Sequence, residues 1–163
     1  MIEKVNPSHP DKVADRIAGA IVDLGYKKEE NPKIAVEVLI GHGNCTVIIE
    51  TSVNYAKKEI REIVKRITKC DKWKWNIKIV KQDIHLANNQ SKEIRCGDNG
   101  IFKGVPLTEN EKLLSKYARN SYLIYPTDGK FILTDDKLIC CQSNVSNKEY
   151  KKFTSVIKDK KVI

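Results

Sequence analysis

Two runs of β-branched residues stand close together in the first half of the chain. They are Ile34–Ile40 and Cys45–Val53, and only Gly41-His42-Gly43-Asn44 separates them. β-Branched residues favour strands, while glycine and asparagine favour the backbone of a tight turn. The sequence therefore predicts two antiparallel strands joined by a turn, so that the fold has to contain a sheet.

Helical periodicity lies on both sides of this strand pair. In Asp11–Leu24 the apolar residues recur at helical spacing, and Gly25 is expected to end that helix. Tyr55–Lys69 carries one apolar stripe with most of its basic residues outside it, which is typical of an amphipathic helix. Trp73–Ile79 then alternates apolar and polar residues, as a half-buried strand does.

The second half of the chain begins after a polar stretch, Asn88–Gly104, whose three glycines predict a long functional loop. The order of elements predicts an α+β fold with an antiparallel sheet and helices packed on one face. We expect two domains, 1–104 and an abbreviated second domain at 105–163. The elements expected in the second half are a helix over Thr108–Tyr117, strands near Tyr122–Tyr125, Phe131–Thr134 and Lys137–Cys141, and a helix over Asn147–Ile157.

Composition limits the class of protein. With 163 residues, 40% of them hydrophobic, the chain can bury a core. Apolar runs such as Thr46–Ile49 are far shorter than the ~20 residues of a membrane helix, and no apolar signal region follows Met1. The five cysteines are odd in number and hold no CxxC pair, which argues against a disulfide framework or a zinc site. We therefore expect a cytoplasmic protein with free thiols.

The chain is also basic. Thirty Lys and Arg residues against 21 Asp and Glu give a net charge of +9, which attracts polyanions. Nucleic acid would be one such partner, because the basic stretch Lys57–Lys69 precedes Trp73 and Trp75. The interleaved Glu59 and Glu62 favour a solvated helix face instead. Nucleotide phosphates are the other candidate.

The segment Ser8-His9-Pro10-Asp11-Lys12 stands where a loop becomes a helix. The N-terminus of a helix attracts anions, so a phosphate could bind there. His9 offers a proton donor or cation, and Asp11 offers a carboxylate for Mg²⁺. The alternative is that Ser8 or Asp11 only caps the helix, while His9 and Lys12 are solvated.

The same segment, extended to Ile17, resembles the opening GHPDK-x-AD-x-I signature of the S-adenosylmethionine synthetases, also called methionine adenosyltransferases. Further family landmarks follow in the family's order, so that the resemblance covers residues 5 to about 135. They are Glu37 and Glu50 on successive strands, Asn89-Gln90-Ser91-Lys92-Glu93-Ile94 for Lys-Gln-Ser-Pro-Asp-Ile, Gly97-Asp98-Asn99-Gly100 for Gly-Asp-Gln-Gly, and Pro126-Thr127-Asp128-Gly129-Lys130 for Pro-Asp-Ala-Lys.

The resemblance implies a reaction in which the sulfur of L-methionine attacks C5′ of ATP and expels triphosphate. A leaving group of that charge needs cationic help. His9 and Lys130 are the implied catalytic residues, and Asp11 and Glu37 are the implied ligands of Mg²⁺ and K⁺. The resemblance assigns ATP to His9, Asp128, Gly129, Lys130 and Asp98, and L-methionine to Glu50, Gln90 and Asp98.

Each assignment has a plainer alternative. Glu37 and Glu50 could simply occupy the solvent face of an alternating strand. Gln90 and Asp98 could be ordinary loop residues, and Asp128-Gly129 is also a strong hairpin-turn signal.

The chain departs from the family pattern in several places. Ser8 replaces a glycine, Pro7 an acidic residue and Asn89 a lysine, and only two residues separate Ile94 from Gly97, where the family has a long lid. The family's third domain, with part of its phosphate clamp, has no counterpart after Ile163. Besides an active enzyme, the sequence thus allows a non-catalytic nucleotide-binding remnant, or a subunit that needs a second polypeptide. A polyanion-binding module is a third alternative, which rests on charge alone.

Family members build their active sites between two subunits. A chain this small has all the more need of a partner to enclose ATP, so we expect a homodimer or a higher oligomer.

Overall fold

The computed structural model describes residues 1–91, 106–154 and 161–162. The chain forms two compact units, Val13–Lys103 and Met1–Lys12 with Gly104–Ile163. We predicted a boundary between residues 104 and 105, with residues 1–12 in the first domain. In the structure, residues 1–12 belong to the unit of the second half of the chain. In chain order the elements are β1 (Ile2–Val5), α1 (Pro10–Lys28), β2 (Ile34–Gly41), β3 (Asn44–Thr51), α2 (Lys57–Thr68), β4 (Lys74–Lys81), α3 (Ile84–Gln90), α4 (Glu109–Ile124), β5 (Gly129–Leu133), β6 (Lys137–Gln142), α5 (Asn147–Thr154) and β7 (Lys161–Val162).

The unit of residues 13–103 contains the sheet β2-β3-β4. Strands β2 and β3 pair antiparallel as predicted, and the turn between them has left-handed backbone at His42 (φ 46°) and Gly43 (φ 75°). Strand β4 pairs with β3 in parallel, because α2 carries the chain back across the sheet between them. This sheet is therefore mixed, where the sequence predicted only antiparallel pairing.

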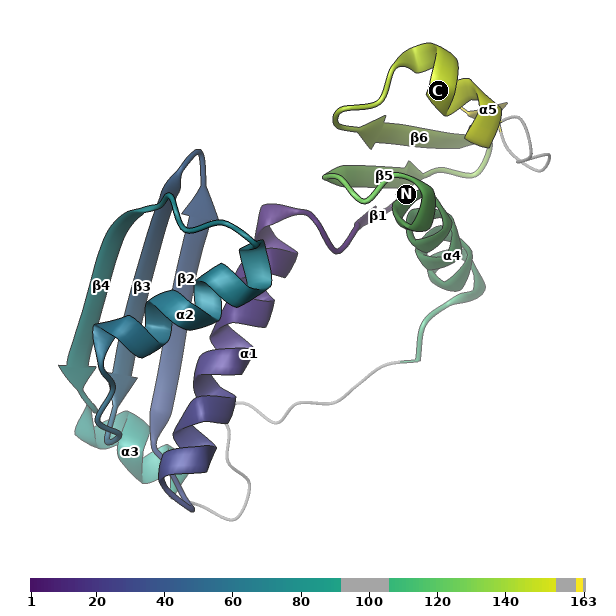
Figure 1. Cartoon of the computed structure of the whole chain (residues 1–163). Helices are drawn as coiled ribbons and strands as arrows, with labels where there is room; N and C mark the ends of the chain where they lie inside the picture. The colour runs from purple at the N-terminus through teal and green to yellow at the C-terminus, as the bar shows by residue number, and fades with distance from the viewer. Residues whose placement is uncertain (92–105, 155–160, 163) are drawn as a thin grey trace. The chain divides into compact units, whose positions relative to one another are not determined.

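Helices α1 and α2 cover one face of this sheet (Figure 1). Alternate residues of the central strand, Cys45, Val47 and Ile49, are fully buried beneath them. Ile17 and Ile21 of α1 complete this core from the helix side, together with Ile60, Ile63 and Val64 of α2. The predicted α+β class, with helices packed on one face, is confirmed for this unit.

Helix α1 continues one turn beyond its predicted end at Gly25. A Cβ at Gly25 would lie 2.5 Å from the hydroxyl of Tyr55, which donates a hydrogen bond to the carbonyl of Ile21 (2.9 Å). The glycine is therefore explained by close packing inside the helix and does not mark its end.

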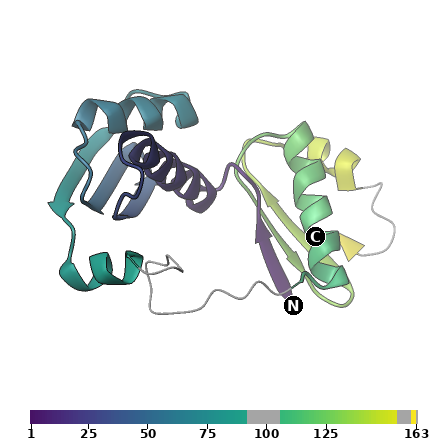
Figure 2. The ribbon, with the colours of Figure 1, turned by 90° about the horizontal axis from the view of Figure 1, so that it is seen from below.

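The second unit contains the sheet β1-β5-β6-β7. Helix α4 lies along one face of it (Figure 2), where Leu114 and Ala118 pack on Phe131, Leu133 and Leu138. Strand β1, which the sequence did not predict, pairs antiparallel with β5, and β5 with β6. The first residues of the chain thereby become part of the sheet built by residues 129–142.

Helix α4 runs to Ile124, so the strand predicted near Tyr122–Tyr125 is wrong. Ser121 is fully buried, and its carbonyl accepts a hydrogen bond from the backbone of Tyr125 (2.8 Å), which continues the helical pattern through the aromatic residues. Of the predicted loop, 88–90 belong to α3 and 92–105 lie outside the described residues. No helix in the described parts of the chain is long and apolar enough to cross a membrane.

Candidate anion-binding site

His9 lies at the start of α1, immediately after the turn that follows β1. Its backbone N–H donates to the carbonyl of Asn6 (3.1 Å). The backbone N–H of Asp11 donates a hydrogen bond to His9 Nδ1 (3.3 Å), so that the imidazole itself caps the helix. Pro10 at the first helical position has no N–H to leave unpaired. The Asp11 carboxylate lies 3.6 Å from His9 Nδ1, an ion pair when the ring is protonated.

The segment from Pro126 to Lys130 is held against this turn. Asn6 N–H donates to the carbonyl of Gly129 (2.9 Å), and Lys130 lies opposite Val5 in the β1–β5 ladder. The hydroxyl of Ser8, which stands where the family pattern has glycine, donates to the carbonyl of Pro126 (3.2 Å). These bonds join two segments of the chain whose residues are about 120 positions apart.

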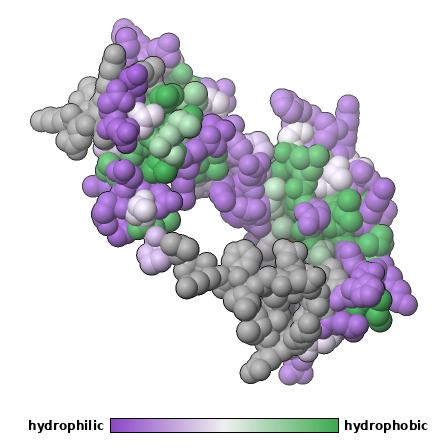
Figure 3. All heavy atoms as spheres, turned by 180° about the vertical axis from the view of Figure 1, so that it is seen from behind, coloured by the Kyte–Doolittle hydropathy of each residue, from purple (hydrophilic) through white to green (hydrophobic). Residues whose placement is uncertain are grey.

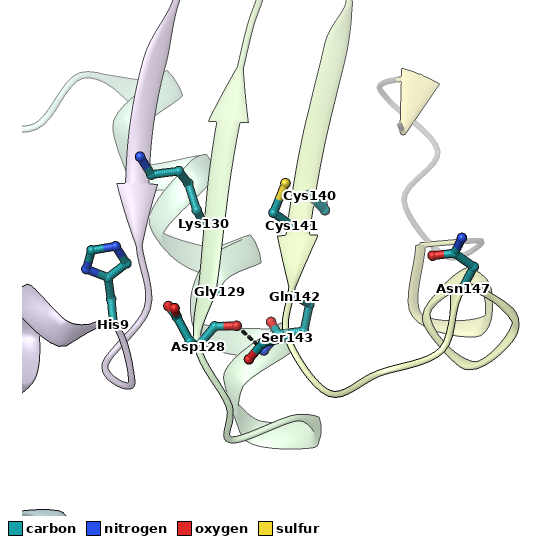
Figure 4. Close-up of a pocket in the computed structure, with 9 residues that line it drawn as sticks. All are labelled: His9, Asp128, Gly129, Lys130, Cys140, Cys141, Gln142, Ser143 and Asn147. Carbon is teal, nitrogen blue, oxygen red and sulfur yellow. Dashed lines mark hydrogen bonds between the residues drawn. The ribbon is translucent and has the colours of Figure 1, made fainter. Parts of the chain in front are cut away.

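Four of the predicted site residues line one open pocket of about 620 Å³. They are His9, Asp128, Gly129 and Lys130, and Figure 4 shows His9 at the turn after β1, facing the strand that carries the other three. Cys141 of β6 lies directly opposite Lys130 and lines the same pocket. The pocket lies wholly within the unit built by residues 1–12 and 104–163.

Two basic side chains at the pocket, Lys130 and His9, could meet an anion, and Asp128 adds one carboxylate to the lining. Lys130 Nζ lies 3.1 Å from Glu3 Oε1, and both side chains are about half exposed. The Lys130 ammonium can therefore turn to a ligand without the cost of leaving a buried partner. His9, one-fifth exposed, adds a second basic group at a helix N-terminus.

The described residues hold no group of three His, Cys, Asp or Glu side chains placed to bind a metal. The Asp11 carboxylate is 78% exposed beside His9. Mg²⁺ is commonly held by one or two carboxylates together with substrate phosphates. Asp11 thus fits a magnesium ion that arrives with its phosphate chain.

Glu37 and Glu50 lie in the other unit, on the face of the β2-β3-β4 sheet opposite α1 and α2. Glu37 is paired with Ile48, two residues before Glu50 on β3, so the two carboxylates share that face. Glu50 Oε1 accepts a hydrogen bond from the backbone of Asp83 (2.7 Å). The side chain of Gln90 and all of Asp98 lie outside the described residues.

Several residues escaped the sequence reasoning: Cys141 and Gln142, which line the pocket, and Glu3 and Asn6, which contact residues that line it. Strand pairing brings these residues together from distant segments of the chain, and no local sequence pattern predicts that pairing. Cys140 points to the side of the sheet that carries α4 and α5, and burial raises its pKa to about 11. Cys141, its neighbour, is exposed.

Comparison with known proteins assigns the family. A sequence model of the S-adenosylmethionine synthetase N-terminal domain matches residues 1–92, more than half of the chain. The chain belongs to the S-adenosylmethionine synthetase family. An S-adenosylmethionine synthase of Helicobacter pylori (strain Shi470) is 32% identical over 126 residues, which cover 69% of this chain and 33% of that protein. One from Acholeplasma laidlawii (strain PG-8A) is 31% identical over 130 residues, or 69% and 34% of the two chains.

This family member therefore spans about a third of the length of the curated relatives that it matches. Its fold resembles that of an unusual S-adenosylmethionine synthetase from Campylobacter jejuni, with a TM-score of 0.65 and 15% identity. That match covers 99% of this chain and 56% of the other. Both units of this chain thus have the fold of a synthetase segment.

Proposed function

We propose that the chain is a methionine adenosyltransferase-type protein, which forms S-adenosylmethionine from ATP and L-methionine and releases triphosphate. The observation that carries the proposal is that His9 and Lys130 line one pocket, although they lie 121 positions apart in the chain. His9 caps α1 and Lys130 pairs with Glu3, but neither contact requires the two basic side chains to share a pocket. A shared polyanionic ligand accounts for both.

In the proposed reaction the methionine sulfur attacks C5′ of ATP, the C5′–O bond breaks, and triphosphate leaves with the electron pair. His9 faces the triphosphate and stabilises the departing 5′ oxygen, while Lys130 clamps the phosphate chain. Asp128 and Gly129 contact ATP beside them. Asp11 would hold Mg²⁺ together with phosphate oxygens, and the bound ion would supply positive charge against the triphosphate.

We assign L-methionine to Glu50, Gln90 and Asp98, Asp98 also to ATP, and K⁺ to Glu37. These assignments come from the resemblance to the family. The shared sheet face of Glu37 and Glu50 supports them only in part, since the plainer solvent-facing alternative predicts the same placement.

We also propose that the chain works as a homodimer or higher oligomer. The face of the β2-β3-β4 sheet that α1 and α2 leave open exposes Leu39 (76%), Ile48 (41%) and Val80 (45%), one from each strand. In Figure 3, which shows the molecule from behind, hydrophobic residues lie next to one another with hydrophilic residues around them. Light scattering should give at least twice the monomer mass, and Ile48→Asp should lower it. A strict monomer at high micromolar concentration contradicts the proposed oligomer.

The cytoplasmic location of the protein stays a prediction.

The deciding experiment incubates the pure protein with ATP, L-methionine, Mg²⁺ and K⁺ and looks for S-adenosylmethionine by mass spectrometry. Product that disappears in His9→Ala supports the proposal. ATP binding without product favours the non-catalytic remnant, or a subunit that needs a second polypeptide. Binding of nucleic acid that falls steeply with salt, without ATP binding, favours the polyanion-binding module.

A further inference from the structure

We propose that Asn6 is a positioning residue, which fixes His9 relative to the Thr127–Lys130 segment so that both can face one anion. The inference rests on the function proposed above and deepens it. Asn6 precedes the signature segment and has no assigned role in it. It is also absent from the residues that line the pocket, so it acts through others.

The polar groups of Asn6 form hydrogen bonds with both the His9 turn and the Thr127–Gly129 segment. The residue is 1% exposed. Its side chain donates from Nδ2 to the carbonyl of Thr127 (2.8 Å), and its Oδ1 accepts from the backbone of Ser8 (3.0 Å). The backbone of Asn6 also bonds to both segments: its N–H donates to the carbonyl of Gly129, and its C=O accepts from the N–H of His9. Asn6 thus joins the His9 turn to the Thr127–Gly129 segment through four hydrogen bonds.

Gln142 holds the same segment from the other side. Its Nε2 donates to the carbonyls of Thr127 (2.9 Å) and Asp128 (3.0 Å). Its Oε1 accepts from the hydroxyl of the buried Ser121 in α4 (3.1 Å). The Thr127 carbonyl therefore receives an amide from each side, and the segment is tied to the core of its unit.

Gly129 shows how closely the two amides approach. A Cβ at this position would lie 2.5 Å from both Asn6 Nδ2 and Gln142 Oε1. Only a glycine therefore fits between the two amides while both hold the segment. Lys130 is the next residue on β5, so a change at Asn6 should move it relative to His9.

The test uses the full chain and inorganic triphosphate with Mg²⁺ as the probe, measured by calorimetry. If Asn6 acts through the placement of His9, Asn6→Ala should weaken triphosphate binding about tenfold, and less than about twofold in a His9→Ala background. Equal weakening in both backgrounds, or none, overturns the proposal. Asn6→Ser, which keeps a small polar side chain, replaces Asn6→Ala if that variant does not fold.

A matched control separates positioning from stability. Asn6→Ala removes two side-chain hydrogen bonds, and Tyr55→Phe removes one buried side-chain hydrogen bond, to the carbonyl of Ile21, in the other unit. Tyr55→Phe should lower the thermal midpoint while leaving the triphosphate Kd unchanged. If Tyr55→Phe weakens triphosphate binding as much as Asn6→Ala does, the effect of Asn6 is on stability only, and the proposal fails.

A second measurement needs no ligand. Amide hydrogen exchange in Asn6→Ala should accelerate at Ser8, His9 and residue 6, but not at Phe131 in the centre of the sheet. Uniform acceleration across the unit, or none at Ser8 and His9, overturns the positioning role. If the wild-type protein does not bind triphosphate, the proposed function fails, and the exchange data alone decide the role of Asn6.

Discussion

Lys130 Nζ lies 3.1 Å from Glu3 Oε1, so the cation that lines the pocket is already paired with a carboxylate of the neighbouring strand. An exposed pair of this kind contributes little to stability. For an incoming anion, however, Glu3 is both a competitor for Lys130 and a repelling charge. If triphosphate binds here as proposed, we expect Glu3 to weaken that binding.

Replacing Glu3 should strengthen the site. We expect Glu3→Gln to tighten triphosphate binding about two- to fivefold at low salt, with a gain that shrinks as salt screens the carboxylate. Calorimetry at two ionic strengths measures this. Glu109→Gln, which breaks the exposed pair with Lys112 (2.7 Å) in the same unit, is the control and should leave the Kd unchanged. Unchanged or weaker binding in Glu3→Gln argues against competition.

His9 and Lys130 should act on one ligand. Each alanine variant should weaken ATP and triphosphate binding about tenfold or more. The ligand-free thermal midpoint should change little in Lys130→Ala, because exposed polar substitutions usually cost less than ~0.5 kcal/mol, and should fall in His9→Ala, which also loses the cap of α1. The double variant should lose less than the sum of the two. Lys116→Ala, on the exposed side of α4, makes the same change in charge and should have no effect. If Lys130→Ala binds ATP and triphosphate normally, the assignment of ATP to this segment is wrong, and Asp128-Gly129 is explained as a hairpin turn alone.

Gly129 should not accept a side chain. The Cβ of Gly129→Ala meets Asn6 and Gln142 at 2.5 Å, so we expect a loss of about 1–3 kcal/mol in the free energy of unfolding, together with weaker triphosphate binding. Gly19→Ala is the matched control, since nothing lies within 4 Å of its added methyl and the site is an exposed helix position. That variant should gain up to about 1 kcal/mol. Denaturant unfolding measures both.

The cysteines should react in a fixed order. Burial raises the pKa of Cys45 and of Cys140 to about 11, so at pH 8 only about one in a thousand of either is thiolate. Their labelling by a disulfide reagent should rise about tenfold per pH unit up to that pKa. Exposed Cys141 should react before Cys45 and Cys140 at pH 8, and triphosphate should protect it because it lines the same pocket. Tandem mass spectrometry separates the neighbours, and equal rates at Cys140 and Cys141 contradict the expectation.

The elements that could be predicted are those whose pattern is local. The alternation in β3 and the apolar stripe of α2 report burial on one face within a few residues, and both elements are found where they were expected. The direction of β4 could not be predicted, because alternating residues look the same in a parallel and an antiparallel strand. Tyr122–Tyr125 was misassigned because aromatic residues favour strands, whereas here buried Ser121 and the core of α4 continue the helix.

The pocket could not be predicted, because it is formed by strand pairing that no local sequence pattern indicates. Strand β1 is four residues long and is defined by its register against β5, where Val5 lies opposite Lys130. The resemblance to a known family suggested that His9 and Lys130 share a ligand, but it gave no reason for Asn6. That reason lies in hydrogen bonds to Thr127 and Ser8, which become visible only when the two segments are side by side.

The discontinuous make-up of the pocket's unit sets an order for folding. Strands β2 and β3 with α2 can pair as they leave the ribosome, since their partners lie within a few tens of residues. Strand β1 is synthesised first, yet it must wait for β5 before it can enter a sheet, which means closing a loop of more than a hundred residues. During that interval Ile2 and Val5, the two apolar residues of the strand, lack their native neighbours. The pocket that His9 and Lys130 line is then among the last parts of the molecule to form, and a chain released before Thr127 would carry His9 without the segment that lines the pocket with it.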